Sequence, residues 1–207
     1  MLPRWYFITT ALVAATGLVT LALATRTRRV QRLDDLLEEH VGPYRARLRR
    51  IADAATLTGE KFVHPVIGAA SALAVFLTRP GAPLRFVLPL ASASLGGIIA
   101  HHLVKLVYHR PRPAVALLRA KTEAAFPSGH TTNATAVVIT SGYILVLEDL
   151  VPVAAAVVCV SALCLATGAS RVALGWHWGT DVLGGWVAGI GIAALCCWGY
   201  DVLRTAG

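Results

Sequence analysis

Charged residues are scarce in this chain. Asp, Glu, Lys and Arg together make up 14% of its 207 residues, whereas hydrophobic residues make up 56%. A soluble domain usually carries about 25% charged residues, and here the apolar residues form long blocks instead of alternating stripes. These proportions exclude an ordinary soluble domain and indicate an integral membrane protein built of helices.

Metal-binding cysteine patterns are missing as well. The four cysteines lie inside apolar runs, with no Cys-x-x-Cys pair and no Cys/His cluster: Cys159, Cys164, Cys196 and Cys197. They are typical of small buried hydrophobic residues, not of a zinc site. The sequence also lacks a basic patch interleaved with aromatic residues, so we expect no nucleic-acid partner. The net charge of +8 favours lipid headgroups or phosphate-bearing substrates.

What the chain has instead is a series of six apolar runs. They occupy residues 5–24, 62–77, 86–106, 131–147, 151–168 and 182–203. A bilayer core needs about 20 helical residues to span it, and the short second run would borrow a turn from the segment before it. No small-residue cleavage site follows the first run, so we expect it to remain as a span. We predict a single all-α membrane domain over residues 1–207, a bundle of six transmembrane helices.

Residues 25–61, between the first two runs, have a different composition. This arm holds nine Lys and Arg and six Asp and Glu, and its apolar residues recur at spacings of three and four. The pattern predicts an amphipathic helix, broken into two at Gly42-Pro43. Basic residues opposite an apolar face suit a helix in the membrane interface. A solvated linker with incidental periodicity is the alternative.

Six spans place the connections after the first, third and fifth runs on one face of the membrane. The arm, the 105–130 segment and the 170–181 segment would therefore meet there, although they are far apart in the sequence. The other connections and both termini would lie on the opposite face. We expect the polar clusters of the chain to converge at one end of the bundle.

A short polar window, residues 170–181, separates the last two runs. Charged residues at the edge of a hydrocarbon layer are functional candidates. His177 and Asp181 are four apart, so they share a face if a helix begins here. The carboxylate would fix the imidazole tautomer and leave the other ring nitrogen as a nucleophile, and Arg171 could hold an anionic substrate. The alternative is a histidine and an aspartate that only satisfy each other at a helix end.

Two further polar groups fall on the same predicted face. Lys105 and Arg112 follow the third run, and prolines beside Arg112 stiffen its backbone. Ser128, Gly129 and His130 stand just before the fourth run, where free backbone N–H groups and the helix dipole favour an anion. A histidine in that position can donate a proton to a leaving oxygen. Together these residues would form a positively charged, donor-rich cradle of the kind that phosphoryl transfer requires.

These three segments resemble the three-part motif of the type 2 phosphatidic acid phosphatase (PAP2) superfamily, which includes membrane-bound lipid phosphate phosphatases. All three parts match in residue type, spacing and order: Lys105-x6-Arg112-Pro113, Pro127-Ser128-Gly129-His130 and Ser170-Arg171-x5-His177-x3-Asp181. The motifs cover residues 105–181, and the six-span layout extends the likeness to the whole chain.

The resemblance implies a role for each matching residue. His177 would attack phosphorus and carry a phosphohistidine, Asp181 would orient it, and His130 would protonate the leaving alkoxide and then activate water. The remaining residues would bind the phosphate oxygens: Lys105, Arg112, Ser128, Gly129 and Arg171. No metal and no cofactor is implied. We assign no catalytic role to His109 or Arg110, and we interpret His101 and His102 as helix-packing residues.

The implied substrate is a lipid phosphate that enters from the bilayer: phosphatidic acid, phosphatidylglycerophosphate or a polyprenyl mono- or diphosphate. Two alternatives are a non-catalytic protein that binds or transports lipid phosphates, and a vanadate-dependent haloperoxidase. Nothing in the sequence specifies an oligomeric state.

The distribution of positive charge bears on the orientation in the membrane. All but four of the 19 Lys and Arg residues fall on the predicted catalytic face, the exceptions being Arg4, Arg79, Arg85 and Arg204. The positive-inside rule places that face in the cytoplasm, whereas many bacterial proteins that resemble this chain act on the outer side. We expect a multi-pass protein of a bacterial plasma membrane with its catalytic face toward the cytoplasm.

Overall fold

The computed structural model describes residues 3–81, 83–117 and 124–205, and the regular structure in these ranges is helical. Arg119 and Lys121, which the charge count assigns to the catalytic face, lie outside them. The elements are α1 (Arg4–Ala24), α2 (Arg28–Val41), η1 (Gly42–Tyr44), α3 (Arg45–Ala55), η2 (Thr56–Gly59), α4 (Val63–Thr78), α5 (Leu84–Val107), α6 (Ala114–Leu117), α7 (Gly129–Leu147), α8 (Val153–Ala173) and α9 (Gly179–Thr205).

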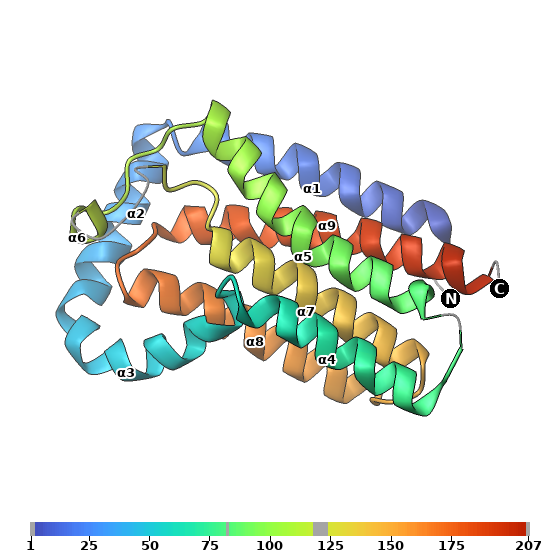
Figure 1. Cartoon of the computed structure of the whole chain (residues 1–207). Coiled ribbons are helices and arrows are strands. Elements are labelled where there is room, and N and C mark those ends of the chain that lie inside the picture. Colours follow the sequence, from blue (N-terminus) through green and yellow to red (C-terminus); the bar gives the residue numbers. More distant parts are fainter. Residues whose placement is uncertain (1–2, 82, 118–123, 206–207) are drawn as a thin grey trace.

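Six long helices, α1, α4, α5, α7, α8 and α9, form the bundle and correspond to the six apolar runs (Figure 1). Helices α7 and α9 are the inner ones: α7 packs against α4, α5, α8 and α9, and α9 packs against α1, α5, α7 and α8. Close approach of α9 to α7 depends on glycines: a Cβ on Gly185 would lie 2.7 Å from Thr131 Cβ, and one on Gly189 would lie 2.5 Å from Thr135 Cβ. The small residues of the last run therefore permit tight helix packing, as predicted.

The protein is a multi-pass membrane protein. Among the described residues, α1, α5, α8 and α9 are long and apolar enough to span a bilayer, and residues 28–59 with α4 form a fifth candidate, bent by 58°. Helix α7 is not among these candidates because it carries polar side chains such as Thr132 and Asn133, which are buried inside the bundle instead of facing lipid. The count of six spans stays a prediction.

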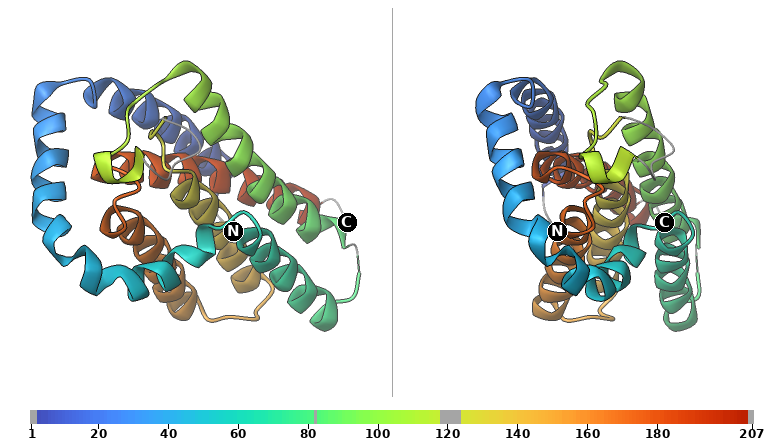
Figure 2. Two further views of the ribbon diagram at one scale, coloured as in Figure 1. Left: turned by 60° about the vertical axis from the view of Figure 1, so that its left-hand side comes forward. Right: turned by 90° about the vertical axis from the view of Figure 1, so that its left-hand side faces the viewer.

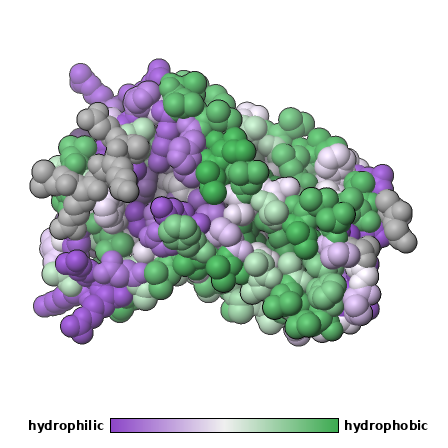
Figure 3. Space-filling model, viewed as in Figure 1, coloured by the Kyte–Doolittle hydropathy of each residue, from purple (hydrophilic) through white to green (hydrophobic). Residues whose placement is uncertain are grey.

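The surface of the molecule is divided along its length (Figure 3). Hydrophobic side chains cover the long helices, and large apolar residues such as Leu12 on α1 and Val158 on α8 are exposed there. Hydrophilic side chains gather at the end that carries α2 and α3. An exposed apolar band beside a polar end is the surface expected of a protein that faces lipid along its helices.

The arm crosses one end of the bundle, where it contacts α8 and α9 (Figure 2). It is two helices with the turn η1 at Gly42–Tyr44 between them, as predicted. Its apolar side chains point outward, since Leu33 is 63% and Ile51 72% exposed, while Asp34 is buried against the protein. The outward apolar face suits the membrane interface. The inward polar contacts were not predicted.

The start of α1 and the end of α9 lie together at the opposite end (Figure 1). Arg4 Nη2 donates to Thr205 Oγ1 at 3.4 Å, and Arg79 Nη2, just after α4, donates to the carbonyl of Glu148, just after α7, at 3.3 Å. The arm, α6 and the 170–181 segment are at the other end. The convergence expected from counting spans is therefore found in the structure.

Candidate active site

The three motifs meet at the end of the bundle that the arm crosses. The last turn of α5 and the chain after it supply the first motif, the N-terminus of α7 the second, and the end of α8 with the start of α9 the third. The chain between α5 and α7 and the turn between α8 and α9 both lie at this end, so the fold brings residues 105–113, 127–130 and 170–181 together.

His177 lies in the turn between α8 and α9 and is 2% exposed. Its Nδ1 is 3.5 Å from Asp181 Oδ2, a charge-pair distance, but Nδ1 makes no hydrogen bond within the described residues. Asp181 is itself fixed, because Oδ2 accepts the Trp178 N–H at 2.9 Å and Oδ1 accepts Arg110 Nη1 at 2.7 Å. The carboxylate is thus held beside the imidazole by other donors.

The other ring nitrogen of His177 faces a cation. Arg112 Nη1 lies 3.3 Å from His177 Nε2 and also donates to the carbonyl of Trp176 at 2.9 Å. Burial lowers the pKa of His177 well below 6.5, and the charges of Arg112, Arg171 and Lys105 lower this pKa further. His177 is therefore neutral near pH 7 and can offer a lone pair.

The second motif forms the start of α7. Ser128 is fully buried, its N–H donates to the carbonyl of Asp181 at 2.9 Å, and its Oγ accepts Thr131 Oγ1 at 2.9 Å. The hydroxyl proton of Ser128 remains available to a ligand. A Cβ on Gly129 would lie 2.9 Å from His101 Nε2, so only glycine fits between the imidazole and the site.

His130 and Arg171 both contact the end of the arm. His130 Nε2 lies 2.9 Å from Glu60 Oε1. Arg171 is buried, its Nη1 donates to Thr56 Oγ1 at 2.8 Å, and its guanidinium stacks on the Trp176 ring at 5.5 Å from the centroid. Lys105, Arg171 and His130 are all close enough to His177 for their charges to act on it.

Arg110 was not predicted to belong to the site, yet it lies at its base. It is buried between two carboxylates, with Nη1 2.7 Å from Asp181 Oδ1 and Nη2 2.6 Å from Asp34 Oδ2. Burial alone would lower the pKa of Arg110, but Asp181 and Asp34 outweigh it and raise that pKa. Asp34 also accepts the Thr180 N–H at 3.0 Å. This chain of contacts ties the arm to the orienting carboxylate.

Sequence patterns missed the arm residues Asp34, Thr56 and Glu60 because their partners are 70 or more residues away. The only available signal was the presence of six acidic residues in an otherwise basic arm. His101 is a packing residue as interpreted, but what it packs against is Gly129 of the second motif.

The positive charge of the site comes from side chains. Within residues 3–81, 83–117 and 124–205, no group of three or more His, Cys, Asp or Glu side chains is placed to hold a metal ion. Lys105, Arg112 and Arg171, together with the N-terminus of α7, are the groups that a phosphate would meet.

Comparisons with known proteins agree with this arrangement. The family model described as PAP2 superfamily matches residues 86–204, which include all three motifs but not the arm. Undecaprenyl-diphosphatase BcrC of Bacillus subtilis (strain 168) is 33% identical over 144 residues, which cover 64% of this chain and 67% of that protein. The crystal structure of a transmembrane PAP2 type phosphatidylglycerolphosphate phosphatase from Bacillus subtilis superposes with a TM-score of 0.74 at 26% identity, covering 90% of this chain and 94% of the other.

Proposed function

The chain belongs to the PAP2 superfamily, and from this membership we propose that it is a lipid phosphate phosphatase that works through a phosphohistidine. The observation that carries the proposal is a buried, neutral imidazole with a carboxylate 3.5 Å from one nitrogen and an arginine 3.3 Å from the other. A second histidine, His130 from α7, is close enough for its charge to act on His177, as are Lys105, Arg112 and Arg171.

In the first step, the lone pair of His177 Nε2 attacks phosphorus and the bond from phosphorus to the lipid oxygen breaks. His130 gives that oxygen its proton, so the lipid leaves as an alcohol or as a monophosphate. Asp181 stabilises the positive charge that develops on the His177 ring. Lys105, Arg112 and Arg171 stabilise the charge on the equatorial oxygens.

In the second step, water attacks the phosphohistidine. His130, now neutral, takes a proton from the water, and the phosphorus–nitrogen bond breaks with its electron pair returning to His177. Inorganic phosphate leaves and the starting protonation states are restored. The Ser128 hydroxyl and the N–H groups at the start of α7 bind phosphate oxygens in both steps.

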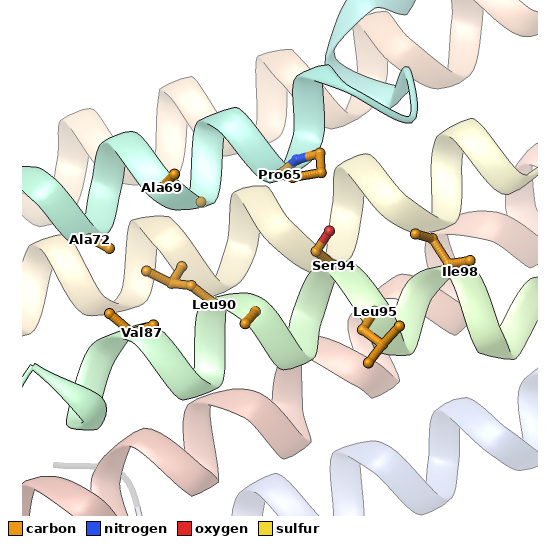
Figure 4. A pocket seen from close by; sticks show the side chains of 10 residues that line it. Pro65, Ala69, Ala72, Val87, Leu90, Ser94, Leu95 and Ile98 are labelled. Atoms are coloured by element: carbon orange, nitrogen blue, oxygen red, sulfur yellow. The ribbon is translucent and has the colours of Figure 1, made fainter.

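We take the substrate to be a membrane lipid because the bundle that carries the cradle also has an apolar groove for a lipid tail. A groove of about 330 Å³ runs between α4 and α5 and is lined mainly by apolar side chains (Figure 4). It extends from Ala72 and Val87 toward Pro65, in the first turn of α4, and Ile98, which precedes Lys105 on α5 by seven residues. A hydrocarbon chain in this groove would leave its phosphate at the polar end.

Both relatives act on lipid phosphates by name, one on undecaprenyl diphosphate and one on phosphatidylglycerolphosphate. We extend that class to this chain, with phosphatidic acid as a third candidate. We place the protein in a bacterial plasma membrane with the cradle on its cytoplasmic face, in keeping with the excess of Lys and Arg at that end.

The test is a panel of these lipid phosphates incubated with purified protein in detergent, with release of inorganic phosphate as the readout. Wild-type protein should release phosphate from at least one lipid, and His177→Ala should release none above background. A protein that only binds lipid phosphates would retain them intact in both forms. Equal release by both forms would refute the proposed mechanism.

A further inference from the structure

The carboxylate of Glu60 contacts the proposed proton donor. Glu60 Oε1 lies 2.9 Å from His130 Nε2, and the Glu60 side chain is 44% exposed. Glu60 stands between η2 and α4, so it comes from the arm and not from any of the three motifs. It also lies outside the residues that the family model covers.

The turn that carries Glu60 is fixed on the bundle by several contacts. A Cβ on Gly59 would lie 2.6 Å from the His130 carbonyl oxygen, so the backbone of the turn lies directly against α7. Thr58 and Thr167 are hydrogen-bonded through their hydroxyls. Thr56 accepts a hydrogen bond from Arg171. Glu60 is therefore held at His130 by a structured turn, and its contact is not that of a free surface side chain.

We infer that Glu60 is a positioning residue for His130: its carboxylate holds the imidazole so that the ring can give its proton to the leaving oxygen. The inference rests on the proposed function and adds a residue to it. A carboxylate can only accept a hydrogen bond, so Nε2 of His130 is the donor in this contact. The other nitrogen, Nδ1, is then the one left to face the leaving oxygen.

The charges around His130 explain why such a partner is needed. Arg171 from α8, Lys105 and His101 from α5, and His177 from the turn before α9 all act on it. Burial is the largest effect that disfavours a protonated ring, and the positive charges of Arg171 and Lys105 disfavour it further. Glu60 is the acidic group that acts on the ring from the arm, and its negative charge stabilises the imidazolium that must donate the proton.

Comparing substrates with different leaving groups tests the inference, because a purely structural role for Glu60 would affect all substrates equally. An alkoxide is a poor leaving group and needs a proton, whereas p-nitrophenolate leaves readily without one. Glu60→Gln keeps the size of the side chain and removes its charge. In single-turnover experiments, which report only the first step, Glu60→Gln should slow cleavage of a dialkylglycerol phosphate by roughly tenfold or more and cleavage of p-nitrophenyl phosphate by less than about twofold.

Two variants serve as controls. Glu39→Gln removes an exposed acid from the same arm and should leave both rates unchanged. Adding Glu60→Gln to His130→Ala should cause no further loss with the alkyl substrate, because a positioning residue has no effect once the residue that it positions is absent.

An equal loss with both substrates, or a further loss in the double variant, would overturn the inference. So would a gain in rate, which would mean that Glu60 blocks the empty site and is displaced by phosphate. These outcomes leave the proposed function intact as long as wild-type protein releases phosphate and His177→Ala does not. Failure of that wild-type reaction would refute the proposed function itself.

Discussion

The two ends of the bundle both bury charged side chains, but they do so differently. At the end that holds the start of α1 and the end of α9, Glu148 accepts a hydrogen bond from the Tyr200 hydroxyl and lies 3.4 Å from Arg85. Asp201 accepts the Tyr143 hydroxyl at 2.9 Å. At the other end, Lys105, Arg112 and Arg171 surround a neutral histidine instead of an acid.

The comparison shows that buried charge alone does not mark an active site in a membrane bundle. The acids at the far end are matched by tyrosine hydroxyls and an arginine from neighbouring helices, as expected of groups that fasten helices together. At the motif end, Arg110 binds both buried acids, Asp181 and Asp34. The charges of three further cations, Lys105, Arg112 and Arg171, act on His177. An excess of positive charge around a neutral imidazole is what suits a phosphate.

Removing one arginine from each end should separate the two roles most clearly. Arg112→Ala should lower kcat/KM for a lipid phosphate by about 10²-fold or more, because a donor to the equatorial oxygens is lost. Arg85→Ala should change kcat/KM by less than about twofold. Steady-state phosphate release with purified variants measures both values. Similar losses for the two variants would remove the distinction between the ends.

A substitution in the arm should lower activity at the motif end by a smaller factor. Asp34→Asn removes the charge that holds Arg110 on the arm side, while Asp181 still binds Arg110 from the other side. We expect kcat to fall about tenfold and the free energy of unfolding to fall by roughly 1–3 kcal/mol. Activity assays and thermal unfolding in detergent test this. Unchanged kcat would show that the arm only covers the site.

At the far end, a substitution that removes a negative charge should lower stability and leave catalysis unchanged. Glu148→Gln weakens the contacts with Tyr200 and Arg85. The free energy of unfolding should fall by about 1–3 kcal/mol, with kcat/KM within about twofold of wild type. A marked loss of activity in folded protein would indicate that this end also takes part in function.

Lowering the pH should change the free energy of unfolding by a still smaller amount, through His177 at the motif end and not through Glu148 at the far end. Because the pKa of His177 in the folded protein lies well below 6.5, the unfolded chain binds more protons than the folded one as the pH falls through 6.5. The free energy of unfolding should then decrease, by up to about 1.4 kcal/mol per pH unit for this group. The unfolding midpoint of wild type should drop more steeply below pH 6.5 than that of His177→Gln, and Glu148→Gln should follow wild type. Parallel curves for wild type and His177→Gln would contradict the pKa argument.

Most of the helices could be predicted from the hydrophobic runs, and the structure shows why some helix boundaries could not. The last apolar run was predicted to begin at residue 182, but α9 begins at Gly179. The helix therefore includes Asp181, and the polar residues of its first turn hide its start. Helix α4 has 16 residues, too few for a span by the usual length rule, and its continuity with the bent arm was predicted only as a borrowed turn.

The candidate site likewise contains residues that the sequence could predict and residues that it could not. The eight motif residues could be identified from type and spacing because each motif lies within a short stretch of chain. Arg110 was set aside although it is the link between Asp34 and Asp181. Its importance depends on a buried acid 76 positions away, and no local pattern reports such a contact. The same holds for Glu60 and His130, which are 70 positions apart.

The account depends most directly on His177 being the residue that takes the phosphoryl group. His130→Ala should still be phosphorylated by p-nitrophenyl phosphate, since that leaving group needs no proton, but it should release the phosphoryl group slowly for want of a base. Mass spectrometry of this variant, kept at alkaline pH, should find the phosphoryl group on His177. A phosphoryl group on another residue, or continued phosphate release with none on His177, would contradict the account.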